Sequence, residues 1–150
     1  MTVFIDPGFD DPTKWATSQW GGYASAVIAG SKATLSYGSV AYLGSWAIFQ
    51  QTVTIPTGYT LEFPYNSYTP WALNAAYVSV LVDNTEVWGM YLNRSKNGVA
   101  TIDLSSYSGS HVIKWKIRVT HDRMAGSGTW WYTPGITIIC PELEANMTIS

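Results

Sequence analysis

Hydrophobic and polar positions alternate with a period of two along most of this chain, in runs that are rich in β-branched and aromatic residues. Gly, Pro, Asn or Ser interrupts these runs about every 8 to 12 residues, a spacing typical of all-β domains. We therefore predict an all-β fold, a single-domain antiparallel β-sandwich with little helix. The expected strands are residues 3–5, 23–28, 33–37, 48–55, 60–66, 77–83, 86–91, 99–104, 111–120 and 136–140.

Two local signals refine this strand pattern. Asp83, Asn84 and Thr85 separate two apolar-rich runs, and because Asn tolerates a positive φ we predict a tight hairpin there. Pro64 lies inside the run 61–65. Since proline has no N–H to donate to a ladder, we expect that strand to be an edge strand or to carry a bulge.

The run 111–120 assigns side chains to the two faces of one strand. The predicted core set is Ile113, Trp115, Ile117 and Val119, which share one parity. The opposite, outer face carries Lys114, Lys116 and Arg118, with Glu62 and Tyr77 as candidate neighbours. Two interpretations stay open: a solvated face with cross-strand charge pairs, or a concave ligand face contacted by Tyr77 and the cations.

The composition indicates a well-cored globular protein. The 150 residues are 47% hydrophobic, 15% aromatic and 12% charged, with a net charge of −2. We predict one domain over 1–150, with a core over about 3–141 and a terminal strand or contact arm over 142–150. The eight Lys and Arg residues are scattered, so we expect no nucleic-acid partner. We also expect no membrane span, no signal peptide and, with Cys140 as the sole cysteine, no internal disulfide.

Tryptophans at expected loop positions are the most informative remaining feature. The candidates are Trp20, Trp46 and Trp71, each next to Gly, Ser or Pro, and Trp130 and Trp131, which follow the Gly-Ser-Gly run 126–128. An aromatic ring matches the apolar C–H face of a sugar, so these residues suit stacking on glycans. The same rings also suit protein–protein contacts, because Trp is enriched at interface hot spots.

Catalytic patterns are weak in this sequence. A glycosidase needs two carboxyl groups held about 5 to 9.5 Å apart, and the spacing of the acidic residues indicates no such pair. No nucleophile motif accompanies His111 or His121. We predict that the chain is not an enzyme.

Four blocks, in this order, resemble the galactose-binding-like jelly-roll domains, which include many carbohydrate-binding modules. The blocks are residues 6–10 (DPGFD) followed by Trp15, 48–61 (IFQQTVTIPTGYTL), 78–84 (VSVLVDN) and 102–109 (IDLSSYSG). They span most of the chain. The resemblance implies a jelly-roll topology for the sandwich and a role in carbohydrate binding.

The resemblance also bears on metal binding. In many relatives, a calcium ion joins an acidic residue after the opening Gly-Phe to an acidic residue in the last strand. Here the candidate ligands are Asp10, Asp11 and Glu142. The acidic pair typical of the last strand is missing, and calcium prefers six to eight oxygens, so the sequence leaves a structural calcium open and predicts no other cofactor.

Two functions from different classes follow. The first is a non-catalytic recognition module that binds glycans through Trp20, Trp46, Trp71, Tyr77, Trp130 and Trp131, with Lys114, Lys116 and Arg118 lining a cleft. We expect it on an extracellular or virion surface, as part of an assembly. The alternative is a purely structural viral protein whose aromatics and tail contact neighbouring subunits, which leaves a homo-oligomer open.

Overall fold

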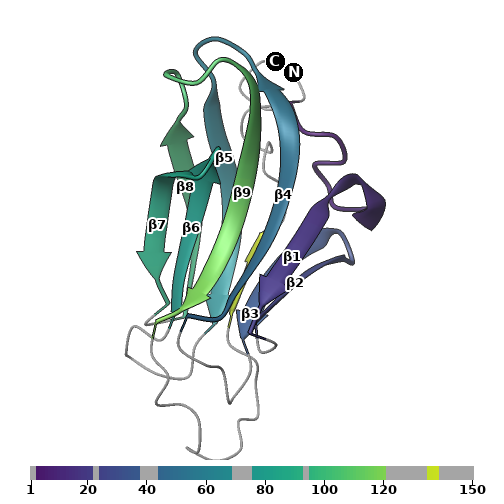
Figure 1. Cartoon of the computed structure of the whole chain (residues 1–150), viewed down its shortest axis with the longest axis vertical. Coiled ribbons are helices and arrows are strands. Elements are labelled where there is room, and N and C mark those ends of the chain that lie inside the picture. Colours follow the sequence, from purple (N-terminus) through teal and green to yellow (C-terminus); the bar gives the residue numbers. More distant parts are fainter. Residues whose placement is uncertain are drawn as a thin grey trace, which may run out of the picture.

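The computed structural model describes residues 3–21, 24–37, 44–68, 76–92, 95–120 and 135–138, which form two antiparallel sheets packed face to face (Figure 1). Sheet A has the strand order β1 (Ala16–Trp20), β4 (Trp46–Ile55), β9 (Gly109–Val119), β6 (Ala76–Val82) and β7 (Thr85–Tyr91). Sheet B has the order β2 (Ala24–Ala29), β3 (Lys32–Tyr37), β10 (Gly135–Ile138), β5 (Thr60–Tyr68) and β8 (Lys96–Asp103). A 3-10 turn, η1 (Pro12–Lys14), precedes β1. The predicted all-β antiparallel sandwich is confirmed, and its jelly-roll connectivity stays a prediction.

The core between the sheets is built around aromatic rings from both layers. Trp115 of β9 is fully buried and stacks on Phe49 of β4, with ring centroids 5.0 Å apart and ring planes 6° apart. Phe63 of β5, in the other sheet, meets Trp115 edge-on at 5.7 Å. The predicted core face of the run 111–120 is thus confirmed, and alternation along the strand sends Lys114, Lys116 and Arg118 to the outer face of sheet A.

One predicted strand is wrong and one strand was not predicted. Residues 3–5 form no strand, because the backbone of Ile5 exchanges hydrogen bonds with the Gln51 side chain (Ile5 N to Gln51 Oε1, 2.7 Å; Gln51 Nε2 to Ile5 O, 2.8 Å) instead of a ladder. The unpredicted strand is β1, the edge of sheet A. Each of its residues is exposed, so its sequence carries no alternation of polar and apolar positions.

The two turn and strand signals have different outcomes. The hairpin is confirmed: β6 and β7 are joined through Asp83 and Asn84, whose φ angles are 52° and 82°. Pro64 lies on an interior strand of sheet B and pairs with Val99, with no register shift in that ladder, so a bulge there is wrong. The pairing of β5 with β10 covers Tyr65 to Tyr68, so Pro64 lies just beyond it. Within the described residues, β5 therefore has a partner at Pro64 only on the β8 side.

Glu62 requires a correction. It lies on β5 in sheet B, not on the outer face of sheet A with the cations. Parity along a strand identifies residues that share a face of that strand, but which sheet a strand joins depends on long-range pairing.

The remaining feature of the fold concerns membrane-spanning helices. The described residues contain no apolar helix of the length that a membrane span requires.

Candidate functional site

A transverse line of four aromatic residues and one arginine crosses the outer face of sheet A. Cross-strand pairing places these residues opposite one another on all five strands, in the order Trp20, Trp46, Arg118, Tyr77, Tyr91. We call this set the aromatic row. Paired residues of adjacent strands point to the same face, so the five side chains stand side by side. The row lies where β4 and β6 begin and β9 and β7 end, at the lower end of the sheet in Figure 1.

The row is long and open to solvent at both ends. Its four intervals between neighbouring strands span about 19 Å, at about 4.8 Å each. The outermost rings are well exposed, Trp20 at 57% and Tyr91 at 45%. Such a length suits an extended ligand with several rings better than a single small molecule.

Three cations cross the row along the central strand. Lys114, Lys116 and Arg118 occupy alternate positions of β9, and we call them the cation column. The Lys116 Nζ lies 5.6 Å from the centroid of the Trp46 ring, and the Arg118 Cζ lies 5.9 Å from that of Tyr77. Both are within the range of a cation–π interaction. The Lys114 Nζ donates to Asn84 Oδ1 at 2.7 Å.

The Tyr77 ring is held in place by a small neighbour and an acidic one. A Cβ atom at Gly89 would overlap the Tyr77 phenol, so glycine at that position makes room for the ring. The Tyr77 hydroxyl donates to Glu86 Oε2 at 2.6 Å. This hydrogen bond, together with partial burial, raises the pKa of Tyr77 to about 12. The phenol therefore stays neutral at ordinary pH, and Tyr91 packs against it edge-on at 4.8 Å.

The structure brings six of the predicted contacts together on this face: Trp20, Trp46, Tyr77, Lys114, Lys116 and Arg118. Trp20 and Trp46 are strand residues, not loop residues as predicted, because β1 and the start of β4 were not expected. Trp71, Trp130 and Trp131 lie outside the described residues. Their proposed contacts stay predictions.

Tyr91, Gly89 and Glu86 are members of this face that sequence reasoning did not assign. They lie on a predicted strand, but a register shift opposite Val80 and Leu81 breaks the alternation along β7. As a result Glu86 and Tyr91 share a face although they are five positions apart, a spacing that regular alternation would put on opposite faces. Because alternation was the available signal, only the pairing with β6 reveals this arrangement.

The candidate calcium ligands are engaged within the protein. Asp10 Oδ1 accepts from Ser31 Oγ at 2.7 Å, and Asp11 Oδ1 accepts from Thr13 N and Oγ1, which lowers the pKa of Asp11. Glu142 lies outside the described residues. Within the described part of the chain, no group of three or more His, Cys, Asp or Glu side chains is placed to hold a metal ion. The calcium site stays a prediction.

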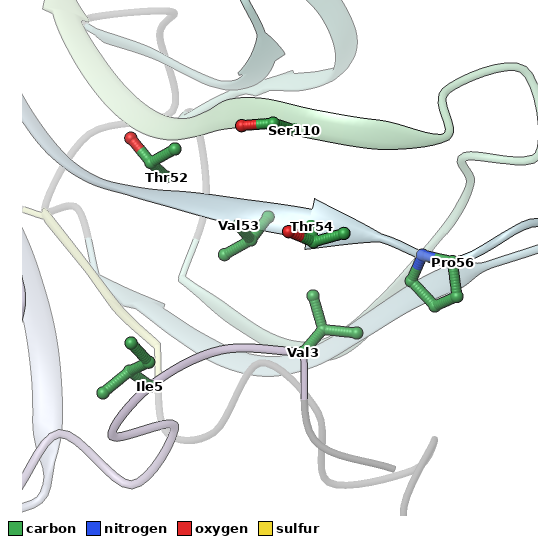
Figure 2. Close-up of a pocket in the computed structure, with 7 residues that line it drawn as sticks. All are labelled: Val3, Ile5, Thr52, Val53, Thr54, Pro56 and Ser110. Atoms are coloured by element: carbon green, nitrogen blue, oxygen red, sulfur yellow. The ribbon is translucent and has the colours of Figure 1, made fainter.

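Two hollows in the surface of the described residues lie away from the aromatic row. One, of about 420 Å³, runs between the N-terminal segment and the end of β4; Figure 2 shows Val3 and Ile5 facing Val53 and Thr54 across it, with Pro56 at one end. The other, of about 360 Å³, is on the outer face of sheet B. Its lining is mainly uncharged and polar: Thr34, Ser36, Asn66, Ser67 and Thr137, with the Tyr68 ring, Gly135 and Ile136.

Comparisons with known proteins identify the fold. No protein-family model matches this chain, and no curated protein does. A variant of a family 29 carbohydrate-binding module complexed with cellulohexaose matches over 93% of this chain and 86% of its own, with a TM-score of 0.53. TmCBM61 in complex with β-1,4-galactotriose matches over 94% and 96% (TM-score 0.50), and a CBM4 structure over 92% and 99% (TM-score 0.50). Each is 14% identical to this chain, which therefore has the β-sandwich fold of carbohydrate-binding modules.

Proposed function

We propose that this protein is a non-catalytic glycan-binding module and that an oligosaccharide chain lies along the aromatic row. The single observation that carries the proposal is the alignment of Trp20, Trp46, Tyr77 and Tyr91 in one cross-strand line. A folded domain gains most by burying such rings. Four of them set side by side on an outer face, two of them about half exposed, are better explained by a ligand than by packing.

The chemistry of the row suits a sugar chain. The C–H face of a pyranose ring is apolar and flat, so it covers an aromatic ring well. Donors stand next to the rings at Arg118 and Lys116, and sugar hydroxyls accept from them. The likeness in fold to modules solved with cellulohexaose and β-1,4-galactotriose supports this function without naming a sugar for this chain.

The remaining predicted contacts extend the proposal. Trp71, Trp130 and Trp131 are proposed to add rings to the same ligand. We also propose that the module acts outside the cell or on a virion surface as part of an assembly. Disproving either of these two parts would leave the proposal for the aromatic row unchanged.

The test is binding to a panel of oligosaccharides that includes cellulohexaose and β-1,4-galactotriose, measured by calorimetry. We expect Trp46→Ala and Tyr77→Ala each to weaken binding about 30-fold, as for residues at the centre of an interface. The matched control is Tyr68→Ala, an exposed ring on the outer face of sheet B, which should leave affinity within about twofold. Equal losses in all three variants, or no binding to any glycan, would contradict the proposal. Release of product from any oligosaccharide would contradict the non-catalytic part.

A second candidate function is subunit contact within a structural, viral assembly. The observation that favours it is the exposure of Trp20 and Tyr91 at opposite edges of sheet A, because an interface between proteins buries such rings equally well. Sedimentation and native mass measurements decide between the two. A stable oligomer that Trp20→Ala and Tyr91→Ala dissociate, with no glycan response, supports assembly; a monomer that binds glycans excludes it.

A further inference from the structure

The cation column is crowded with like charge. Lys114, Lys116 and Arg118 follow one another at alternate positions of β9, so their Cα atoms lie about 6.8 Å apart. On the strands of sheet A, the acidic side chain that shares this outer face is Glu86 of β7. The Glu86 carboxylate already accepts a hydrogen bond from the Tyr77 hydroxyl. Asp83, in the turn between β6 and β7, lies close enough to Lys114 for that charge to contribute to the lowered pKa of Asp83.

Among the described residues, none of the three cations forms an ion pair with a carboxylate. Across the described residues, no carboxylate oxygen lies within 4.0 Å of the side-chain nitrogens of these cations. The ion pair that these residues do contain joins His111 and Asp83. Lys116 and Arg118, the two cations at the aromatic row, lie against the neutral rings of Trp46 and Tyr77. Lys114, farther along β9, donates to the Asn84 amide and has the Asp83 carboxylate nearby. Partial burial, and to a smaller extent the charges of Arg118 and Lys114, lower the pKa of Lys116.

We propose that the ligand of the aromatic row is an acidic glycan, whose sugar rings carry carboxylate or sulfate groups, and that Lys116 and Arg118 pair with those groups. This inference rests on the proposed function and narrows its substrate class. A ring stacked on Trp46 or Tyr77 has a cation beside it, because each of these aromatic side chains lies next to one member of the column. An anionic substituent would neutralise the charge of Lys116 and Arg118, for which the described residues supply no ion pair.

A simpler role for the cations is to donate hydrogen bonds to neutral hydroxyls. The two roles differ in their response to salt. Ion pairs exposed at a surface weaken as the Debye length falls from about 14 Å to about 4 Å between about 0.05 M and about 0.5 M salt, whereas stacking and neutral hydrogen bonds do not. Salt dependence of affinity is therefore a direct readout of the charge on the ligand.

The experiment uses matched ligands on the full chain. The probes are cellulohexaose, the same hexaose oxidised at its primary hydroxyls to glucuronates, and the hexaose sulfated at those hydroxyls, with the corresponding three forms of β-1,4-galactotriose. The carboxylate and sulfate arms distinguish the two sources of negative charge. Affinities are measured by calorimetry at low and high salt.

The variants test the assigned side chains. Lys116→Met keeps an apolar stem over Trp46 and removes the charge, and Arg118→Gln keeps a donor beside Tyr77. Lys32→Met, an exposed lysine on sheet B, is the matched control for the loss of one charge. We expect an acidic form to bind at least about fivefold more tightly than its neutral parent at low salt, and each column variant to remove about two- to fivefold of that advantage. Lys32→Met should not change it.

The outcomes separate this inference from the function on which it rests. If the neutral parent binds the row as tightly as both acidic forms, the acidic-glycan inference is overturned and glycan binding stands. If Lys32→Met weakens acidic binding as much as Lys116→Met does, attraction is unspecific and the inference also fails. No binding by any of the six probes overturns both.

Discussion

The two outer faces of this sandwich come from the same fold, yet they carry different chemistry. The outer face of sheet A bears the aromatic row and the cation column. The outer face of sheet B bears hydroxyl and amide groups around its hollow, with Tyr68 as the ring at its rim. Its exposed apolar side chains, Val27, Tyr68 and Val99, stand on three different strands and do not form a line.

The comparison shows which of the two outer faces has a composition that folding alone accounts for. Ser, Thr and Asn on an outer face are well solvated and need no partner, so the outer face of sheet B is what a half-buried antiparallel sheet ordinarily presents to water. On the outer face of sheet A, four rings and an arginine are aligned across five strands, and the two outermost rings are exposed to water, which favours their burial. The like charges of the cation column also repel one another. The outer face of sheet A therefore carries features that folding alone does not require.

Among changes at residues that surround the aromatic row, the largest effect on affinity should come from removing the space that glycine leaves beside Tyr77. Gly89→Ala would put a methyl group into the Tyr77 phenol and displace the ring from the row. We expect glycan affinity to fall about tenfold, or about 1.4 kcal/mol, in calorimetric titrations. The matched control is Gly98→Ala on β8, whose added methyl would instead press on Tyr65 beside the core. It should lower the free energy of unfolding by about 1 to 3 kcal/mol and leave affinity unchanged; the reverse pattern would contradict the assignment.

A second, smaller effect concerns the protonation of Tyr77. Glu86 raises the pKa of this phenol from 10.0 to about 12 chiefly through its hydrogen bond. Because the folded pKa lies above the unfolded one, this contribution to stability is complete below pH 10 and is lost as the pH rises toward 12. In Glu86→Gln the phenolate absorbance of one tyrosine should shift to lower pH. Glu62→Gln on sheet B should show no such shift, and an unchanged titration in Glu86→Gln would refute the coupling.

The smallest effect is expected at the opposite end of sheet A from the aromatic row, where His111 pairs with Asp83. The hydrogen bond between them raises the pKa of His111 and lowers that of Asp83. The pair therefore stabilises the fold fully between pH 3.8 and 6.5; the contribution fades as Asp83 is protonated below this window and as His111 loses its proton above it. In Asp83→Asn, the His111 pKa measured by NMR should fall, whereas Asp103→Asn on sheet B should leave it unchanged. Ligand affinity should stay constant in both variants.

Much of the fold could be predicted from the local alternation of polar and apolar residues. Alternation located nine of the strands, the Asp83-Asn84 turn and the buried face around Trp115, because burial on one face of a sheet leaves a period-two record in the sequence. β1 left no such record, since its side chains are all exposed. The strand predicted over residues 3–5 is absent, because the Gln51 side chain, not a neighbouring strand, pairs with the backbone of Ile5.

Spacing along single strands was enough to predict the antiparallel sandwich and the shared face of Lys114, Lys116 and Arg118. The line of Trp20, Trp46, Tyr77 and Tyr91 with Arg118, and the place of Glu62 in the other sheet, became visible only in the folded chain. These features depend on the register between strands, which is set by partners far apart in the sequence. Alternation within a strand carries no information about which residue of another strand will lie beside it.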